Sequence, residues 1–349
     1  MAEAFGVGVV GCGWAAGSIA EAIDTIDGAK IVAAHDEVLA AAAKLAEPRG
    51  ATVHPTLAAL LADPAVHLVY IGLPHHLLAG IAELALKAGK HVLVEKPMAL
   101  DPAQCLALGR LAEERGLTLC VFFELRKSGL VTVARDLVSG GAIGAVRTIR
   151  ITTVLDKKMT YWRSPVSGDL NWRTRVAEAG GGVVLMNSIH QIDSVLHITG
   201  VSATRAMGEV ATLHAPDGVE VEDSAAGSVR LSNGGILSIV AAAHSPGAGE
   251  GESIGIDGEH GRIDIPSPWA AEASVRLFLR RPWKGHADGQ WITIPTPKPD
   301  FYAAMVGDLV AAVRDGTPAP ATASDAAAAL SIVLAIYRSS REGRAIDLA

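Results

Sequence analysis

The sequence predicts an α/β protein of two domains, a doubly wound parallel sheet followed by an α+β domain with a mostly antiparallel, open sheet. Its 349 residues are enough for two domains of ordinary size. The first part of the chain alternates apolar strands with amphipathic helices, which implies a parallel sheet covered on both faces. Beyond residue 123, strands follow one another through tight turns. We therefore expect domains at 1–123 and 124–349, with the C-terminal helix a candidate to pack back on the first.

The elements of the first domain follow from apolar runs and their boundaries. Helices end at or near glycines, and Asp101-Pro102-Ala103-Gln104 predicts a helix start with Asp at the N-cap and Pro at the first helical position. The predicted strands are 5–10, 31–34, 66–72, 91–94 and 117–123, and the predicted helices are 14–26, 37–47, 75–87 and 102–116.

The second domain begins with helical and β patterns and continues in hairpins. Ser232-Asn233-Gly234-Gly235 and Gly258-Glu259-His260-Gly261 are turn signals between β-rich runs. The predicted helices are 130–139, 183–198, 300–314 and 324–341, and a long strand is predicted at 146–155.

Composition excludes several classes of protein. Half of the residues are hydrophobic and 19% are charged, which excludes a disordered chain. A net charge of −7 disfavours general binding to nucleic acid or to an anionic membrane. Three cysteines form no disulfide framework, and the longest apolar run, 326–337, is too short for a bilayer span. Residues 1–5 lack a basic signal region, so we expect a cytoplasmic protein.

A glycine-rich turn carries the strongest functional signal. Gly11-Cys12-Gly13-Trp14-Ala15-Ala16 is a G-x-G-x-x-A pattern between a strand and a helix. Gly11 permits the tight turn, and Gly13 lets the backbone approach a diphosphate that a Cβ would block. Asp36 follows the second strand, where a carboxylate accepts both ribose hydroxyls. With Glu37 beside it, a 2′-phosphate would be repelled, so NAD is expected rather than NADP. The alternative is a glycine turn in a fold that binds no dinucleotide.

Together with this turn, further motifs resemble the Gfo/Idh/MocA family of glucose–fructose oxidoreductase and inositol dehydrogenase relatives. The resemblance implies a Rossmann domain, a substrate domain whose open sheet mediates oligomer contacts, and NAD(P)-dependent chemistry on sugars or polyols. It covers nearly the whole chain and rests on Asp36, Gly72-Leu73-Pro74, Glu95-Lys96-Pro97, Arg126, Gly140–Gly144, Trp172-Arg173, Ala179–Gly182, His190–Asp193 and Ala335–Arg338.

The resemblance also implies residue roles. In the family, the Lys of the Glu-Lys-Pro motif is catalytic, as is a His that matches His190, and the Glu that matches Glu95 lies beside the nicotinamide ribose. This sequence departs from the family at four places. Met186 stands where many members have an Asp, and Glu124 stands where they have an Asn. Leu73-Pro74-His75 replaces a Thr-Pro-Asn turn, and Leu78 stands where a His often follows that turn.

The predicted helix 183–198 can be interpreted without the family. Leu185, Ile189, Ile192 and Leu196 form one apolar stripe, and Met186, His190, Asp193 and His197 form an adjacent stripe. Asp193, three residues after His190, can orient its imidazole as a general base; the alternative is a structural His–Asp hydrogen bond.

Aromatic residues are scarce, so Tyr161-Trp162 and Trp172 stand out. Sugar sites often use aromatic faces beside hydrogen-bond donors, although an ordinary packing loop explains these residues equally well.

We therefore expect an NAD-dependent oxidoreductase that interconverts a secondary alcohol and a ketone on a sugar, polyol or related cyclic substrate. The alternatives are an enzyme that retains NAD for elimination or glycoside cleavage through transient oxidation, and a non-catalytic sugar- or NAD-sensing regulator. A homodimer or homotetramer and no catalytic metal are expected. The expected catalytic residues are Lys96 and His190; the cofactor residues are Gly11, Cys12, Gly13, Trp14, Ala15, Asp36, Leu73, Pro74, His76, Glu95, Lys96 and Arg173; and the substrate residues are Arg126, Tyr161, Trp162, Asn187 and His190.

Overall fold

The computed structural model describes residues 5–164, 167–248, 250–270, 274–298 and 300–348. The N-terminal residues considered above as a signal segment therefore lie outside the described residues, except Phe5. The chain forms two compact units. The first comprises Met1–Glu124 and Asp300–Ala327, and the second comprises Leu125–Pro299 and Ala328–Ala349.

The first unit is built on a six-stranded, entirely parallel sheet. Its order is β3-β2-β1-β4-β5-β6. Successive strands are added on one side of β1 up to β3 and on the other side from β4 onward, so the strand order has a switch point between β1 and β4. Ligands of such sheets bind beyond the carboxyl ends of the strands at this switch point. The predicted doubly wound sheet is confirmed. The strands are β1 Phe5–Val10, β2 Ala29–His35, β3 Thr52–Val53, β4 Leu68–Ile71, β5 His91–Val94 and β6 Leu119–Val121.

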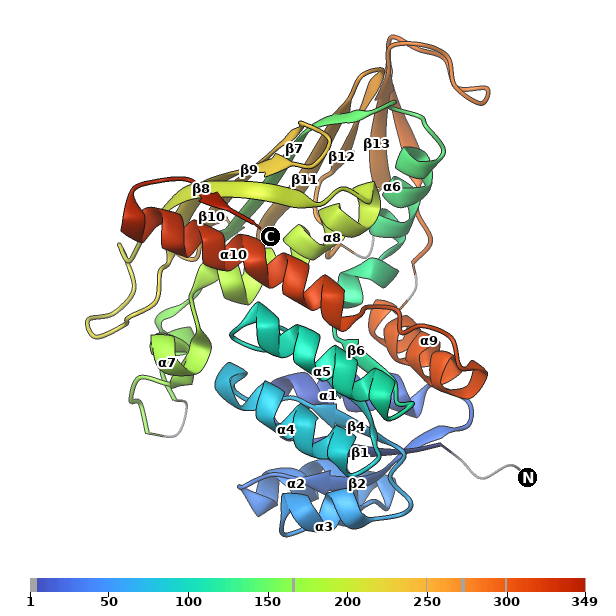
Figure 1. The fold of residues 1–349 in the computed structure, drawn as a ribbon, viewed down its shortest axis with the longest axis vertical. Coiled ribbons are helices and arrows are strands. Elements are labelled where there is room, and N and C mark those ends of the chain that lie inside the picture. Colours follow the sequence, from blue (N-terminus) through green and yellow to red (C-terminus); the bar gives the residue numbers. More distant parts are fainter. Residues whose placement is uncertain (1–4, 165–166, 249, 271–273, 299, 349) are drawn as a thin grey trace. The chain divides into compact units, whose positions relative to one another are not determined.

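Helices cover both faces of this sheet. Figure 1 shows α4 and α5 in front of the strands and α1 behind them, and α1 contacts α9. Asp101 is the N-cap of α5 and its carboxylate accepts the Ala103 N–H at 2.9 Å, so the predicted helix start is confirmed. The helices are α1 Trp14–Asp24, α2 Leu39–Ala46, α3 Leu57–Ala62, α4 His75–Lys87, α5 Pro102–Glu114 and α9 Phe301–Asp315, with 3-10 turns at Glu47–Arg49 and Glu124–Lys127.

The second unit is built on a nine-stranded sheet of order β14-β13-β12-β11-β7-β10-β9-β8-β15. Strands β7 and β10 pair in parallel, and the other pairs in the described part of this sheet are antiparallel. Both predicted hairpins are present, as β9–β10 and β11–β12. The strands are β7 Val146–Leu155, β8 Ala203–Ala211, β9 Ser224–Leu231, β10 Ile236–Ala242, β11 Glu250–Gly258, β12 Gly261–Ile265, β13 Ser274–Leu279, β14 Trp291–Pro295 and β15 Ile346–Asp347.

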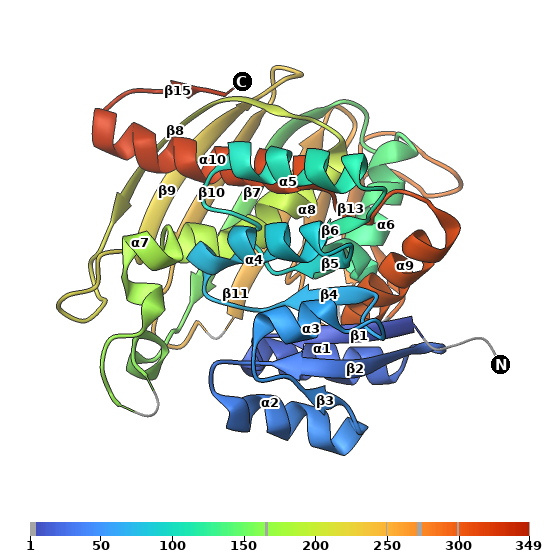
Figure 2. The same ribbon diagram turned by 60° about the horizontal axis from the view of Figure 1, so that its bottom comes forward.

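Helices lie along one side of this sheet, as Figure 2 shows for α8 and α10. Along β10, Leu237, Ile239 and Ala241 are buried, whereas Ile236 and Val240 are 41% and 50% exposed on the other side. This alternation is typical of a sheet with one covered face. The helices are α6 Gly129–Ser139, α7 Val176–Ala179, α8 Ile189–Thr199 and α10 Ala323–Glu342, which continues from the first unit into the second; 3-10 turns occupy Met159–Trp162 and Trp172–Thr174.

The predicted helix 183–198 differs in its first turn. Val184–Ser188 form a π-helical turn, and the α-helix α8 begins only at Ile189. A π turn carries more residues than an α turn, so residues before Ile189 are rotated relative to the predicted stripes. Leu185, Ile189 and Ile192 are buried as predicted, but Leu196 is only half-buried.

Candidate functional site

The glycine turn after β1 has the shape that the sequence predicts. Gly11 adopts φ +84°, and a Cβ there would lie 2.3 Å from the Gly72 carbonyl oxygen. Its N–H donates to the His35 carbonyl at 3.0 Å, which joins the ends of β1 and β2. At Gly13, by contrast, a Cβ would meet no atom of the chain within 4 Å. Gly11 is therefore required by the fold, whereas Gly13 leaves open space in front of α1, where a diphosphate fits.

Asp36 connects the glycine turn to the end of β2. One carboxylate oxygen accepts the Cys12 N–H and the other accepts the Val38 N–H, each at 2.8 Å. Because a carboxylate oxygen accepts two hydrogen bonds, each retains capacity for a ribose hydroxyl. Arg49 is engaged elsewhere, since its guanidinium pairs with Asp24 at 2.7 Å and donates to the Leu45 carbonyl. The residues present thus fit an NAD adenosine.

Three other residues of the turn differ in exposure. Trp14, the first residue of α1, is 86% exposed, whereas Ala16 is buried against the sheet. Ala15 is half-buried. Burial and the neighbouring Asp36 charge raise the pKa of the Cys12 thiol to about 12, so Cys12 stays protonated.

A second group of predicted residues follows β4 and β5. Leu73 and Pro74 lie between β4 and α4, where His75 is buried and His76 is exposed. The Tyr70 hydroxyl donates to Glu95 Oε1 at 3.1 Å, and the Lys96 N–H donates to Glu95 Oε2 at 3.2 Å. Desolvation raises the pKa of the Glu95 carboxyl, against the effects of Lys96 and Tyr70. Glu95 is thus held at the carboxyl edge of the sheet beside Lys96.

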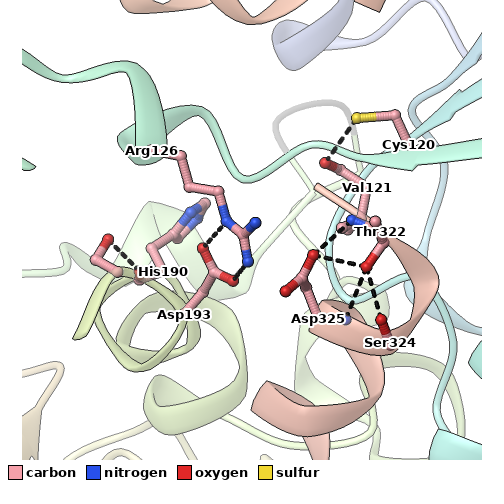
Figure 3. A network of polar contacts seen from close by, with 9 residues as sticks. Cys120, Val121, Arg126, His190, Asp193, Thr322, Ser324 and Asp325 are labelled. Atoms are coloured by element: carbon pink, nitrogen blue, oxygen red, sulfur yellow. Dashed lines mark hydrogen bonds and ion pairs between the residues drawn. The ribbon is translucent and has the colours of Figure 1, made fainter. Parts of the chain in front are cut away.

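In the second unit, Arg126 and Asp193 form a buried ion pair. Figure 3 shows the two side chains pointing toward each other. Arg126 Nε donates to Asp193 Oδ2 at 2.8 Å and Nη2 donates to Oδ1 at 2.6 Å. Both carboxylate oxygens of Asp193 thus accept a hydrogen bond from Arg126, which was expected to contact substrate.

His190 lies on α8 one turn before Asp193 (Figure 3). Its ring packs edge-on against Trp269 at 5.1 Å between centroids, and its main-chain carbonyl accepts the Ser194 hydroxyl at 2.7 Å. The side chain is largely buried, and Asn187, on the preceding π turn, is half-buried. Trp269 is a neighbour of His190 that no pattern in the sequence predicts.

Tyr161 contacts Met186, the residue in place of the family's Asp. Its hydroxyl donates to Met186 Sδ at 3.0 Å, and burial raises its pKa against the opposing effect of Arg173. The Arg173 guanidinium lies 5.5 Å from the centre of the Tyr161 ring and 4.6 Å from that of Trp172. Trp162 is buried and packs edge-on against Tyr161 at 5.0 Å. The aromatic residues singled out in the sequence thus gather into one cluster.

Glu222 holds the start of the helical segment that carries His190. One of its oxygens accepts the Gly182 N–H at 2.6 Å; the other accepts the Val184 N–H at 3.0 Å and the Tyr337 hydroxyl at 2.8 Å. A Cβ on Gly182 would lie 1.7 Å from the Glu222 carbonyl oxygen, which explains the glycine run before this segment. Burial raises the pKa of the Glu222 carboxyl. Sequence reasoning missed Glu222 because it caps the segment from 40 residues away.

Among the described residues, no group of three or more His, Cys, Asp or Glu is arranged to hold a metal ion. Within the same residues, no helix is both long and apolar enough to cross a bilayer.

Two family models match the chain. Residues 5–123 match the oxidoreductase family with an NAD-binding Rossmann fold, and residues 131–264 match the C-terminal domain of the same family. This chain belongs to the Gfo/Idh/MocA family. The predicted resemblance, the oxidoreductase class and the NAD cofactor are thereby confirmed.

Relatives within the family have diverged widely. Levoglucosan dehydrogenase of Pseudarthrobacter phenanthrenivorans is 28% identical over 264 residues, a match that spans 66% of each chain. The scyllo-inositol 2-dehydrogenase (NADP⁺) of Bacillus subtilis is 25% identical over 98% of this chain and 95% of its own. A solved structure of levoglucosan dehydrogenase with NADH superposes with a TM-score of 0.88 at 22% identity, covering 99% of this chain and all of the other, which shows the shared fold.

Proposed function

We propose that this Gfo/Idh/MocA protein is an NAD-dependent oxidoreductase that interconverts a secondary alcohol and a ketone on a sugar, polyol or related cyclic substrate. The observation that carries the proposal is the cofactor cradle, in which Asp36 is fixed to the glycine turn and open space faces Gly13. The substrate class is supported by relatives named as dehydrogenases of levoglucosan and scyllo-inositol.

The cradle favours NAD over NADP. A 2′-phosphate would meet the carboxylates of Asp36 and Glu37. Arg49, the nearest arginine downstream, is committed to Asp24 and to the Leu45 carbonyl, so it is not placed to neutralise that phosphate. One relative is named as an NADP⁺-dependent enzyme, so the cofactor preference of this chain has to be measured directly.

In this proposal Lys96 and His190 both act on the substrate oxygen that changes between hydroxyl and carbonyl. Bound NAD would accept the hydride from the substrate carbon. His190 takes the hydroxyl proton, while the Lys96 ammonium donates a hydrogen bond to the same oxygen and stabilises the developing negative charge. Because Met186 replaces the family's acid, the two roles can be exchanged, with Lys96 transferring the proton. Arg126, Tyr161, Trp162 and Asn187 remain the proposed substrate contacts, and Trp14, Leu73, Pro74, His76 and Arg173 the proposed cofactor contacts beside the glycine turn.

A screen at 340 nm with levoglucosan, myo-inositol, scyllo-inositol and glucose, each with NAD⁺ or NADP⁺, tests this function. We expect reduction of NAD⁺ by at least one compound, with kcat/KM at least about tenfold higher than with NADP⁺. Product without net NADH formation would indicate the enzyme with retained NAD. Tight sugar binding without any turnover would indicate the sensor.

Lys96→Ala then tests the mechanism. We expect kcat to fall by about 10²–10⁴-fold while NADH still binds. Lys87→Ala is the matched control, since Lys87 is exposed on α4 and pairs with Glu83. Turnover by Lys96→Ala at the rate of the control would remove Lys96 from the mechanism.

We also propose a homodimer or homotetramer. The support is the uncovered side of the nine-stranded sheet, where Met207, Ile236, Val240 and Trp291 are 41–52% exposed. Light scattering of the intact protein measures the assembly, and a monomer at micromolar concentration would contradict this proposal.

A further inference from the structure

Acidic and phenolic side chains gather at the carboxyl edge of β4, β5 and β6 in the first unit. Strands β4 and β5 align with Ile71 opposite Val94, and β5 and β6 align with Val94 opposite Val121. Glu95 and Lys96 directly follow β5, and Glu124 follows β6 by three residues. Since carboxyl ends of parallel strands meet at one edge, these residues emerge beside each other.

We call Tyr70, Glu95, Glu124 and Tyr302 the acid–phenol cluster. Glu124 is 3% exposed. Burial raises the pKa values of both Tyr70 and Tyr302, and the charges of both Glu95 and Glu124 raise them further. Each carboxylate therefore lies within electrostatic reach of each phenol. The phenols remain neutral, so the negative charge of the cluster resides on the two glutamates.

Two buried carboxylates require a cation close by. Removing a charge from water costs several kcal/mol unless a partner of opposite sign compensates for it. Lys96 adjoins Glu95 in the chain, and its charge opposes the desolvation of the Glu95 carboxyl. Glu95 already uses both oxygens for the Tyr70 hydroxyl and the Lys96 N–H.

One sequence departure falls at this edge. This chain has Glu124, in the 3-10 turn just after β6, where the family resemblance leads us to expect an Asn. We propose that Glu124 is a positioning residue that holds Lys96, which follows the neighbouring strand β5, in its ammonium form. The importance of this role for turnover rests on the proposed function.

The chemical consequence concerns the hydrogen bond from Lys96 to the reacting oxygen. A carbonyl oxygen that becomes an alkoxide is stabilised more strongly by a positively charged donor than by a neutral one. A neighbouring carboxylate favours the ammonium, so it keeps Lys96 protonated to higher pH. Other titratable groups at this edge are His75 at the start of α4, Tyr70, Glu95, Tyr302 and Asp300, the N-cap of α9. They are unchanged when Glu124 alone is substituted.

Amine labelling of the whole protein tests the proposal without any substrate. Acetic anhydride reacts with neutral amines, so peptide mass spectrometry of Lys96 labelling between pH 7 and 11 gives the midpoint of its titration. In Glu124→Gln we expect this midpoint to fall by about one pH unit or more, because an opposite charge has been removed. Glu83→Gln is the matched control: it removes an exposed carboxylate of the same unit, on α4, and should leave the Lys96 midpoint unchanged.

One more variant completes the test. Glu124→Asn, which restores the family residue, should give the same fall as Glu124→Gln; this second neutral variant serves if the first is unstable. A Lys96 midpoint that stays unchanged in folded Glu124→Gln or Glu124→Asn overturns the proposal. Absence of turnover with every polyol would count against the proposed function and leave these results intact.

Discussion

Substituting Asp193 by Asn tests the buried ion pair of the second unit. The change keeps the size of the side chain and removes its charge. Both partners are nearly inaccessible, with side chains 6% exposed for Arg126 and 2% for Asp193, and two hydrogen bonds join them at 2.6 and 2.8 Å. In the variant the buried Arg126 guanidinium would lose the charge of Asp193, and one of the two oxygens that accept its hydrogen bonds would become an amide NH₂ group, which only donates.

The magnitude follows from this geometry. Breaking a buried pair by removing one charge costs about 3–5 kcal/mol, because the remaining charge is left uncompensated. For a unit of roughly 200 residues, each kcal/mol lowers Tm by about 2–4 °C, so Asp193→Asn should lower the Tm of this unit by about 6–20 °C. Arg126→Met combined with Asp193→Leu should be much milder, since an apolar pair of similar volume removes both charges together.

Differential scanning calorimetry provides the measurement, with Glu342→Gln as the control. Glu342 pairs with Arg338 one turn away on α10, where the side chains are 33% and 52% exposed. Exposed pairs contribute about 1 kcal/mol at most. If Asp193→Asn lowered Tm no more than Glu342→Gln, the argument from burial would be wrong.

Three further predictions concern the first unit. Gly13→Ala should leave Tm within about 2 °C, because its Cβ meets no atom of the chain, yet weaken NADH binding by about tenfold or more in a fluorescence titration; unchanged affinity would remove the diphosphate from this position. Cys12 should react with iodoacetamide at pH 8 about a thousandfold more slowly in the folded apoprotein than in urea, since a pKa of about 12 leaves little thiolate; equal rates by mass spectrometry would contradict the raised pKa. Asp63→Asn should flatten the decline of Tm in acid. The Ala65 N–H and, to a lesser degree, His54 lower the pKa of Asp63, so its contribution is present above the ordinary carboxyl pKa and is lost as pH falls through the folded value; parallel Tm curves between pH 5 and 2 would refute this.

The features best predicted from the sequence are the strands, helices and turns that depend on residues close together in the chain. The structure places β1, α4, β5 and β7 at the residues expected from apolar runs and their flanking glycines and prolines. The glycine turn and Asp36 were found for the same reason, since strand, turn, helix and acid follow each other in order. The two-residue strand β3 and the six-residue helix α3 were missed because such short elements give no periodic signal.

Contacts between residues far apart in the chain could not be predicted from the sequence. Spacing within the helix places Asp193 near His190, three residues away, but it could not show that the Asp193 carboxylate pairs with Arg126, 67 residues away. The π turn before α8 is held by Glu222 and Tyr337, whose hydroxyl accepts the Leu185 N–H at 3.2 Å from 152 residues away. Spacing within one helix specifies which side chains are neighbours, but it does not specify which distant group competes for them.

The chain passes through the cofactor-binding unit twice, and this has a consequence during biosynthesis. The β6 edge is completed when the Val121 N–H donates to the Ala321 carbonyl at 3.2 Å, and Arg314 of α9 donates to the Gly28 carbonyl at 2.8 Å. When the ribosome has made the first 124 residues, these partners do not yet exist. About 200 more residues must be added, which takes roughly 10–40 s at ordinary elongation rates. During this interval the nascent nucleotide fold lacks α9 behind α1, so a nascent-chain protease assay should find it cleavable until residue 327 has emerged.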